Sequence, residues 1–230
     1  MGFSGLVAEV FLLREFLIVF AGNEFSIGLI LANWVVLEAL GALIFGRLLE
    51  KLPGKVETLV GLTVLFVLFL LGAIFLIRSL KGLLGISVGE LVSLAPMFYS
   101  SFLILAPVSV LHGALFPACC QVYSLFAGPD APSAGRVYAY ETIGTVIGGV
   151  VCTYLFVPHL HTFQVVFWLA LLNLIVCIAL LVPFWRTGGF SRALLIVQAV
   201  LIAAVGYGIF AGPADALHRL SIQTQWRGLH

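Results

Sequence analysis

Long runs without a formal charge constrain this fold more than any other feature of the sequence. The 20 residues 58–77, TLVGLTVLFVLFLLGAIFLI, contain no Asp, Glu, Lys or Arg, and neither do the 44 residues 142–185. About 20 apolar residues at 1.5 Å each cross the hydrocarbon core of a bilayer. The first run therefore predicts one transmembrane helix, and the second predicts two helices with a turn at HLHTF, residues 159–163. Residues 193–214 predict one more.

Three further segments complete a predicted all-α bundle of about seven spans. Residues 3–21 and 26–47 are apolar but contain ionisable groups, and AGNE links them. The uncharged run 91–129 is too long for one crossing, since a helix of that length would extend about 60 Å. Pro96, Pro107 and Pro117 interrupt it, so we expect one span with a break near APVSVLHGALFP, or two short spans and a count of eight.

Composition agrees with a chain surrounded by lipid. Hydrophobic residues make up 62% of the 230 and charged residues 9%, with a mean hydropathy of +1.20. A soluble domain carries about 25% charged residues. We therefore expect an integral membrane protein whose main partner is the bilayer. The net charge of +1 indicates no nucleic-acid partner.

The domain prediction is a transmembrane helical domain over residues 1–214, followed by a short polar carboxyl-terminal tail over residues 215–230. The opening residues MGFSG lack the basic region of a cleaved signal peptide, so the first helix is expected to be retained. Positive charges near the predicted loops number six on one side and four on the other, counting Arg78 among the four. This weakly favours a cytoplasmic amino terminus, and seven spans would then place the carboxyl terminus outside.

Cysteine and histidine patterns predict no metal site and no cofactor. All four cysteines lie in apolar runs, where free thiols pack as small hydrophobes, and none has CxxC spacing. They are Cys119, Cys120, Cys152 and Cys177. No combination of His, Cys and carboxylate residues has the spacing of zinc ligands.

Ionisable or polar side chains inside the predicted spans are the candidate substrate-binding or ion-pair residues. They are Glu9, Arg14, Glu15, Glu38, His112, Tyr138 and Glu141. A charge at the centre of a bilayer costs about 2.5–3.5 kcal/mol on insertion scales, so such groups face partners or a wet cavity. On one helix Arg14 lies about 140° from Glu9 and about 100° from Glu15, at 100° per residue. Pairing of Arg14 with Glu38 or Glu141 on other spans is therefore easier.

Three interpretations of these groups remain open. They form an ion-pair network that locks the first, second and fifth spans, they line a cavity for a cationic or proton-coupled substrate, or Arg14 or Glu15 reaches the interface. His112 is a packing histidine or a proton relay. Because carboxylates outnumber the arginine, a cavity formed by Glu9, Glu38 and Glu141 would suit an amine.

Glycines predict close helix packing in two spans. Gly144 and Gly148 have GxxxG spacing with Gly149 beside them, and the span over 26–47 contains Gly41 and Gly46. Small residues let helix backbones approach in lipid, where no hydrophobic force drives association. The second and fifth spans are therefore expected to be the most closely packed.

Several segments, in order over residues 3–158, resemble the membrane region of spermidine-synthase-like proteins. They are GLVAEVFLLRE, GNEFSIGLILANWVVLEALGALIFGRL, HGALFP and AGRVYAYETIGTVIGG. The matching positions are Glu9, Arg14, Arg47, Pro117, Arg136, Tyr138, Gly144 and Gly148; Glu141 stands where relatives often have Asn. The resemblance implies a transporter-like arrangement in which the first six helices are similar to half of a major-facilitator fold.

The resemblance also implies a soluble aminopropyltransferase domain, which this chain lacks. No glycine-rich nucleotide-binding turn occurs, and only 16 residues follow the last predicted span. The chain alone is therefore not expected to be an enzyme; intramembrane catalysis is the least supported reading. The leading hypothesis is a module that transports or channels a small amine such as a polyamine. The alternative is a non-transporting anchor or assembly subunit for a separately encoded aminopropyltransferase-like or other partner.

The same resemblance implies a bacterial cytoplasmic (inner) membrane as the location. Half of a transporter would have to dimerise to enclose a pathway, so the expected partners are a second copy of the chain or a soluble synthase-like protein. Carboxylates inside the spans are the observation on which the transport hypothesis depends.

Overall fold

The structure is a computed structural model that describes residues 1–22, 24–86, 90–128, 133–184 and 189–226. Over these residues the chain is helical and contains no strand. The helices are α1 (Gly2–Phe20), α2 (Glu24–Lys51), α3 (Lys55–Leu84), α4 (Leu94–Ala127), α5 (Ser133–Val151), α6 (Val157–His159), α7 (Thr162–Leu181), α8 (Gly189–Phe210) and α9 (Pro213–Gln225). A π-helical turn, Cys152–Phe156, joins α5 to α6, and a 3-10 turn, Val182–Phe184, follows α7.

Within the described residues, six helical segments are long and apolar enough to cross a membrane. They are Glu24–Lys51, Lys55–Leu84, Leu94–Ala127, Ser133–His159, Thr162–Phe184 and Phe190–Phe210. This agrees with the prediction of a helical membrane protein. Helix α1 is not among the six, and it contains Glu9, Arg14 and Glu15 within its 19 residues.

The predicted turn at 159–163 is confirmed. Helix α6 ends at His159, and α7 begins at Thr162 behind a capping box, in which the side chain of His161 accepts from the Gln164 amide. The Gln164 side chain in turn accepts from the His161 amide, so two amides at the helix start are satisfied.

The predicted break in the fourth span is wrong. Helix α4 continues from Leu94 to Ala127 with Pro107 and Pro117 inside it. Each proline removes only one backbone donor, and such losses are tolerated in membrane helices that pack tightly against neighbours. Here α2 makes the most extensive helix–helix contact in the described structure with α4. That contact supports the helix where its own hydrogen bonding is interrupted.

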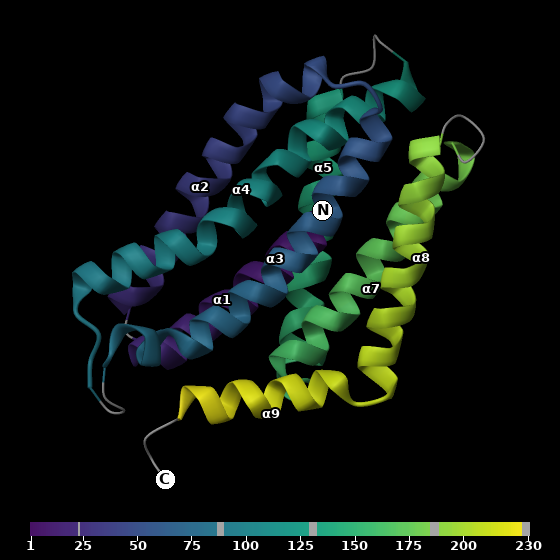
Figure 1. Ribbon diagram of the computed structural model, residues 1–230. Coiled ribbons are helices and arrows are strands. Elements are labelled where there is room, and N and C mark those ends of the chain that lie inside the picture. The colour runs from purple at the N-terminus through teal and green to yellow at the C-terminus, as the bar shows by residue number, and fades with distance from the viewer. Residues whose placement is uncertain (23, 87–89, 129–132, 185–188, 227–230) are drawn as a thin grey trace.

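The helices form a bundle around α1 and α3 (Figure 1). Helix α1 contacts α3, α5 and α7, while α2 and α4 pack together on one side and α7 and α8 on the other. The largest fully buried side chains include Phe11, Phe16 and Phe66, which place the core between α1 and α3. Cys152 and Cys177 are buried and Cys119 and Cys120 half-buried, all as free thiols.

Glycines on α2, α4 and α5 mark the closest approaches between helices. A Cβ at Gly41 would overlap the Val110 carbonyl of α4, and one at Gly113 would overlap the Glu38 carbonyl of α2. Gly144 and Gly148 lie against the backbone of Phe3 on α1. The second and fifth spans are thus closely packed, each against a different partner.

Two of the predicted packing glycines behave differently. In the part of the chain that the structure describes, nothing lies within 4 Å of the position that a Cβ would take at Gly46, so the expectation of close packing is wrong there. Gly46 follows Gly41 by five residues, which turns it away from the face that meets α4. At Gly149 the only such neighbour among the described residues is a methyl group of Leu6, at 3.4 Å.

Helix α9 lies across the end of the bundle (Figure 1). Residues 215–225, expected to belong to a polar tail, form most of this helix. Ala214 and Ser221 are buried, and the helix contacts α3 and α7. The carboxyl-terminal region therefore covers the ends of the membrane helices instead of leaving them directly.

Candidate functional site

Five of the seven predicted site residues line one cavity of about 430 Å³. Glu9 comes from α1, Glu38 from α2, His112 from α4, and Tyr138 and Glu141 from α5. Glu9, Glu38 and Glu141 are half-buried, and Tyr138 is exposed. Residues from four helices thus form one site, which we call the acidic pocket.

His112 is the most tightly held member of the acidic pocket. Its Nδ1 lies 2.7 Å from Glu38 Oε1, so an N–H at this nitrogen donates to the carboxylate. Its ring stands between the rings of Trp34 and Phe66, at centroid distances of 5.9 and 5.6 Å. Nε2 is buried and has no hydrogen-bond partner among the described residues.

Gly5 creates the space that the His112 ring occupies. A Cβ at this position of α1 would overlap the imidazole at Nε2. The ring is therefore enclosed by Gly5 on one side and the two aromatic residues Trp34 and Phe66 on the others. The unpaired Nε2 consequently stays close to α1, on the wall of the acidic pocket.

Negative charge predominates in the acidic pocket. Among the described residues that line it, none is Lys or Arg, while three are glutamates. The remaining polar groups include the hydroxyl-bearing Thr142 and Thr145 of α5. Such a set suits a cationic guest. Elsewhere in the described structure, and here, no group of three or more His, Cys, Asp or Glu residues is placed to hold a metal ion.

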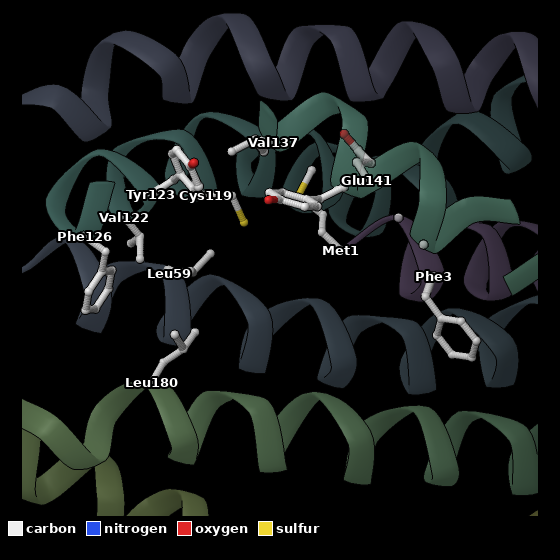
Figure 2. A pocket seen from close by; sticks show the side chains of 13 residues that line it. Met1, Phe3, Leu59, Cys119, Val122, Tyr123, Phe126, Val137, Glu141 and Leu180 are labelled. Atoms are coloured by element: carbon white, nitrogen blue, oxygen red, sulfur yellow. The ribbon is translucent and has the colours of Figure 1, made fainter. Parts of the chain in front are cut away.

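A second cavity of about 390 Å³ lies beside the amino-terminal end of α1 (Figure 2). Its walls are mostly apolar and include Leu59, Val122, Phe126, Val137 and Leu180. We call it the apolar cavity. In Figure 2 the Cys119 sulfur points into it and Glu141 lies on the side opposite Leu180. Gly2 and Glu141 line both this cavity and the acidic pocket, so the two adjoin.

Glu15 belongs to a different, fully buried cluster. Arg78 of α3 binds it through two hydrogen bonds, Nη2 to Oε1 at 2.6 Å and Nε to Oε2 at 2.7 Å. Thr162 of α7 donates to the same carboxylate at 2.5 Å. The guanidinium carbon of Arg78 stands 5.1 Å from the centre of the Phe163 ring. This pair joins α1, α3 and α7.

Helix α9 extends this cluster to the surface. Arg78 Nη1 donates to Ser221 Oγ at 2.7 Å and to His218 Nδ1 at 3.0 Å. A guanidinium has no acceptor, so His218 is neutral here, with its proton on Nε2. The His218 ring stacks on His161 at 4.2 Å, and His161 Nε2 lies 2.7 Å from Asp215 Oδ1.

Two groups of α9 have shifted pKa values. Burial, followed by the neighbouring His161 and Arg78, lowers the pKa of His218. The hydrogen bond from His161 lowers the pKa of the exposed Asp215 carboxyl. Both shifts favour the protonation states that hold α9 against the bundle.

The predicted pairing of Arg14 with Glu38 or Glu141 is wrong. Its side chain is exposed, and no hydrogen bond or ion pair with another described residue reaches it. Arg14 is turned away from the faces of α1 that present Glu9 and Glu15, as the helical angles require. Arg14 points outward, which agrees with the interpretation that its side chain reaches the interface.

Sequence reasoning missed Arg78 as the partner of a buried glutamate. Arg78 directly follows the uncharged run 58–77, so the sequence places it among the loop charges. A signal was present, because Arg78 continues the same apolar stretch without a turn residue before it. Nothing in the sequence, however, relates it to Glu15, which is 63 residues away.

No family model, curated protein or solved structure matches this chain. Its function must therefore be inferred from the geometry of the site and from the sequence.

Proposed function

We propose that this protein is a membrane-embedded module that binds a small organic cation, such as a polyamine, in the acidic pocket for transport or channelling. The observation that carries the proposal is the convergence of Glu9, Glu38 and Glu141 on one cavity that no described Lys or Arg lines. Glu38 and His112 lie near the middle of α2 and α4, where charge is most costly in a bilayer. A bound cation would offset that cost.

The aromatic wall adds to the attraction for a cation. Trp34 lines the acidic pocket and is itself buried. The face of an indole attracts an ammonium group within about 6 Å. His112 holds the Glu38 carboxylate in place through the hydrogen bond at its Nδ1.

Binding of spermidine to the protein in lipid nanodiscs tests the proposal. We expect Glu38→Gln and Glu141→Gln each to lower affinity by about tenfold, as for loss of a charged hydrogen bond. Glu50→Gln, at an exposed position outside the acidic pocket, is the matched control and should bind as the wild type does. Unchanged affinity in both pocket variants would remove the basis of the proposal.

We also propose that the chain is a member of the spermidine-synthase-like membrane proteins, in a bacterial inner membrane. In this proposal α1 crosses the bilayer as a seventh span, and the first six helices resemble half of a major-facilitator fold. The buried Glu15–Arg78 pair supports a spanning α1, because the charge of Glu15, a buried carboxylate of this helix, is neutralised inside the bundle. A second copy of the chain would complete a pathway.

The alternative function, a non-transporting anchor for a soluble synthase-like or other partner, draws support from α9. Leu220 and Ile222 of α9, and Trp226 directly after it, are exposed. Purification of the protein from native membranes in mild detergent distinguishes the anchor function from the transport function. A stoichiometric soluble partner would favour the anchor, and purification without one would count against it.

A further inference from the structure

We infer that the apolar cavity holds an acyl chain of a membrane phospholipid, and that the phosphate of this lipid binds Arg136 at the mouth of the cavity. The site is separate from the acidic pocket and does not depend on the proposed function. The inference rests on the shape of the cavity, on its openings to the outside of the bundle, and on the arginine beside them.

The apolar cavity is elongated and closed at its inner end. There Met1 stands in the wall, and a Cβ at Gly2 would overlap the Glu141 carbonyl, so α1 and α5 meet without a gap. Residues 133–140 of α5 extend past this contact by about 12 Å, at 1.5 Å per residue. Figure 2 shows Met1 at one end of the cavity and Phe126 at the other. The cavity therefore leads away from the acidic pocket, toward the end of the bundle.

One side of the apolar cavity opens to the outside of the bundle. Helix α5 packs on α1 and α4 but makes at most a marginal contact with α7, which supplies Leu180 to the opposite wall. Tyr140 and Phe126 both line the cavity and are 64% and 61% exposed. In a bilayer this opening faces lipid, so an acyl chain can enter between α5 and α7. A chain in this apolar space supplies dispersion contacts that the wall would otherwise lack.

Arg136 stands at the outer part of the cavity as a cation without a described carboxylate partner. It directly precedes Val137, a lining residue, and its Nη1 donates to the hydroxyl of Tyr123, another lining residue, at 3.0 Å. The Arg136 side chain is exposed, and no described carboxylate forms an ion pair with it. A guanidinium has five donors in a planar fork that fits a phosphate. One hydrogen bond to Tyr123 leaves donors for such a group.

The depth of Arg136 in the membrane agrees with the phosphate layer. The span Ser133–His159 has 27 residues, about 40 Å at the standard rise, whereas the hydrocarbon core is about 30 Å thick. Arg136 lies in the first turn of this span and therefore in the headgroup region, with the rest of the cavity at the depth of acyl chains. The same end of the bundle carries six of the ten positive charges near the predicted loops, and clustered basic residues attract anionic lipids.

Native mass spectrometry of the detergent-purified protein, titrated with phosphatidylglycerol, tests the phosphate contact. Arg192→Gln, at an exposed position of α8 near the same end, is the matched control for Arg136→Gln. We expect Arg136→Gln to weaken binding of the first lipid by about tenfold or more, as for loss of a charged hydrogen bond, and Arg192→Gln to leave it unchanged. Diacylglycerol lacks the phosphate, so its binding should not respond to Arg136→Gln. Glycerol 3-phosphate lacks the chains and should bind far more weakly than the phospholipid.

Filling the apolar cavity tests the position of the acyl chain. Val122→Phe adds bulk inside it, and Leu125→Phe adds the same bulk at an exposed position of α4. We expect Val122→Phe to weaken binding of phosphatidylglycerol and of diacylglycerol by about tenfold, since several methylene groups lose their contacts, and Leu125→Phe to alter neither. Should Val122→Phe not fold, Cys119→Leu fills the same cavity, because the Cys119 sulfur points into it (Figure 2).

Three results would overturn this inference. Equal losses in Arg136→Gln and Arg192→Gln would show only a general attraction of lipid to positive charge. Wild-type affinity in a cavity-filling variant that folds would place the lipid outside the cavity. Glycerol 3-phosphate bound as tightly as the phospholipid would show that the acyl chain contributes nothing. None of these results bears on spermidine binding, which Glu38→Gln and Glu141→Gln test separately.

Discussion

At the scale of single residues, neighbouring charges on α1 have opposite roles. Glu15 is 1% exposed and is held by Arg78 and Thr162, whereas the adjacent Arg14 points outward without a described partner. A buried charge that loses its partner is strongly destabilising, while an exposed charge contributes little. A difference of one residue, which is a rotation of 100° around the helix, therefore decides whether a charged side chain of α1 contributes to stability.

This contrast predicts the outcome of two adjacent substitutions. Glu15→Ala leaves the Arg78 guanidinium buried without its carboxylate, which should cost about 3–5 kcal/mol. Arg14→Ala should change stability by about 0.5 kcal/mol or less. Thermal unfolding of both variants in the same detergent, followed by tryptophan fluorescence, checks the difference. Similar midpoints for the two would show that the Glu15–Arg78 pair is not a structural support.

At the scale of helices, the contact between α2 and α4 depends on two glycines that face each other's backbone. Gly41→Ala and Gly113→Ala would each place a methyl group on a main-chain carbonyl, and overpacking of this kind costs about 1–3 kcal/mol. Gly46→Ala, also on α2, meets open space and should stabilise the helix slightly. The unfolding midpoints of the three variants test this prediction. Loss of stability in Gly46→Ala, or none in Gly41→Ala, would contradict this account of the packing.

The docking of α9 should depend on pH. Burial lowers the folded pKa of His218 from its ordinary value of 6.5, so the proton binds more readily when α9 is released. Docking is therefore complete above about pH 6.5 and weakens as the pH falls below it. The lowered pKa of Asp215 acts in the same direction at more acidic pH.

A spin label at Arg219→Cys, on the exposed side of α9, measures this release. Its mobility should rise between pH 7.5 and pH 5.5, because protonated His218 faces Arg78 and His161 and can no longer accept from the guanidinium. His218→Asn keeps an acceptor without a titrating group and should abolish the change over this range. A label equally mobile at both pH values in the unsubstituted helix would refute the prediction.

At the scale of the whole molecule, the Glu15–Arg78 pair changes which arginine counts toward the charge balance between the two ends. Arg78 is one of the four positive charges that the sequence places near the end that carries α9, but its charge is neutralised inside the bundle. The exposed Arg14, beside Glu15, takes its place, so the balance stays at four against six. The positive-inside rule therefore still weakly favours a cytoplasmic position for the loop at residues 52–54.

This asymmetry predicts the sidedness of the protein in cells. A cysteine at Pro53→Cys should be protected from an impermeant thiol reagent in intact cells, and one at Arg219→Cys should be labelled. The native cysteines are buried or half-buried within helices and form a low background. The reverse pattern would place α9 in the cytoplasm, and it would favour the anchor function over transport.

The sequence by itself determined the class of fold and the local features that depend on neighbouring residues. Uncharged runs of bilayer length, the turn before Thr162 and the glycines at 41, 144 and 148 were all readable, because hydrophobicity and spacing act along one helix. It also identified Glu9, Glu38, His112 and Glu141 as residues that would not face lipid. Their convergence on one cavity was suggested only as a condition for binding an amine.

The tertiary structure alone decided which helices meet. It paired Glu15 with Arg78 instead of leaving Arg14 as the buried cation, and it folded residues 213–225 over the bundle end. It also placed an apolar cavity beside the acidic pocket. These features join side chains on different helices, and a hydropathy pattern records how far each residue is from water but not which neighbour it contacts.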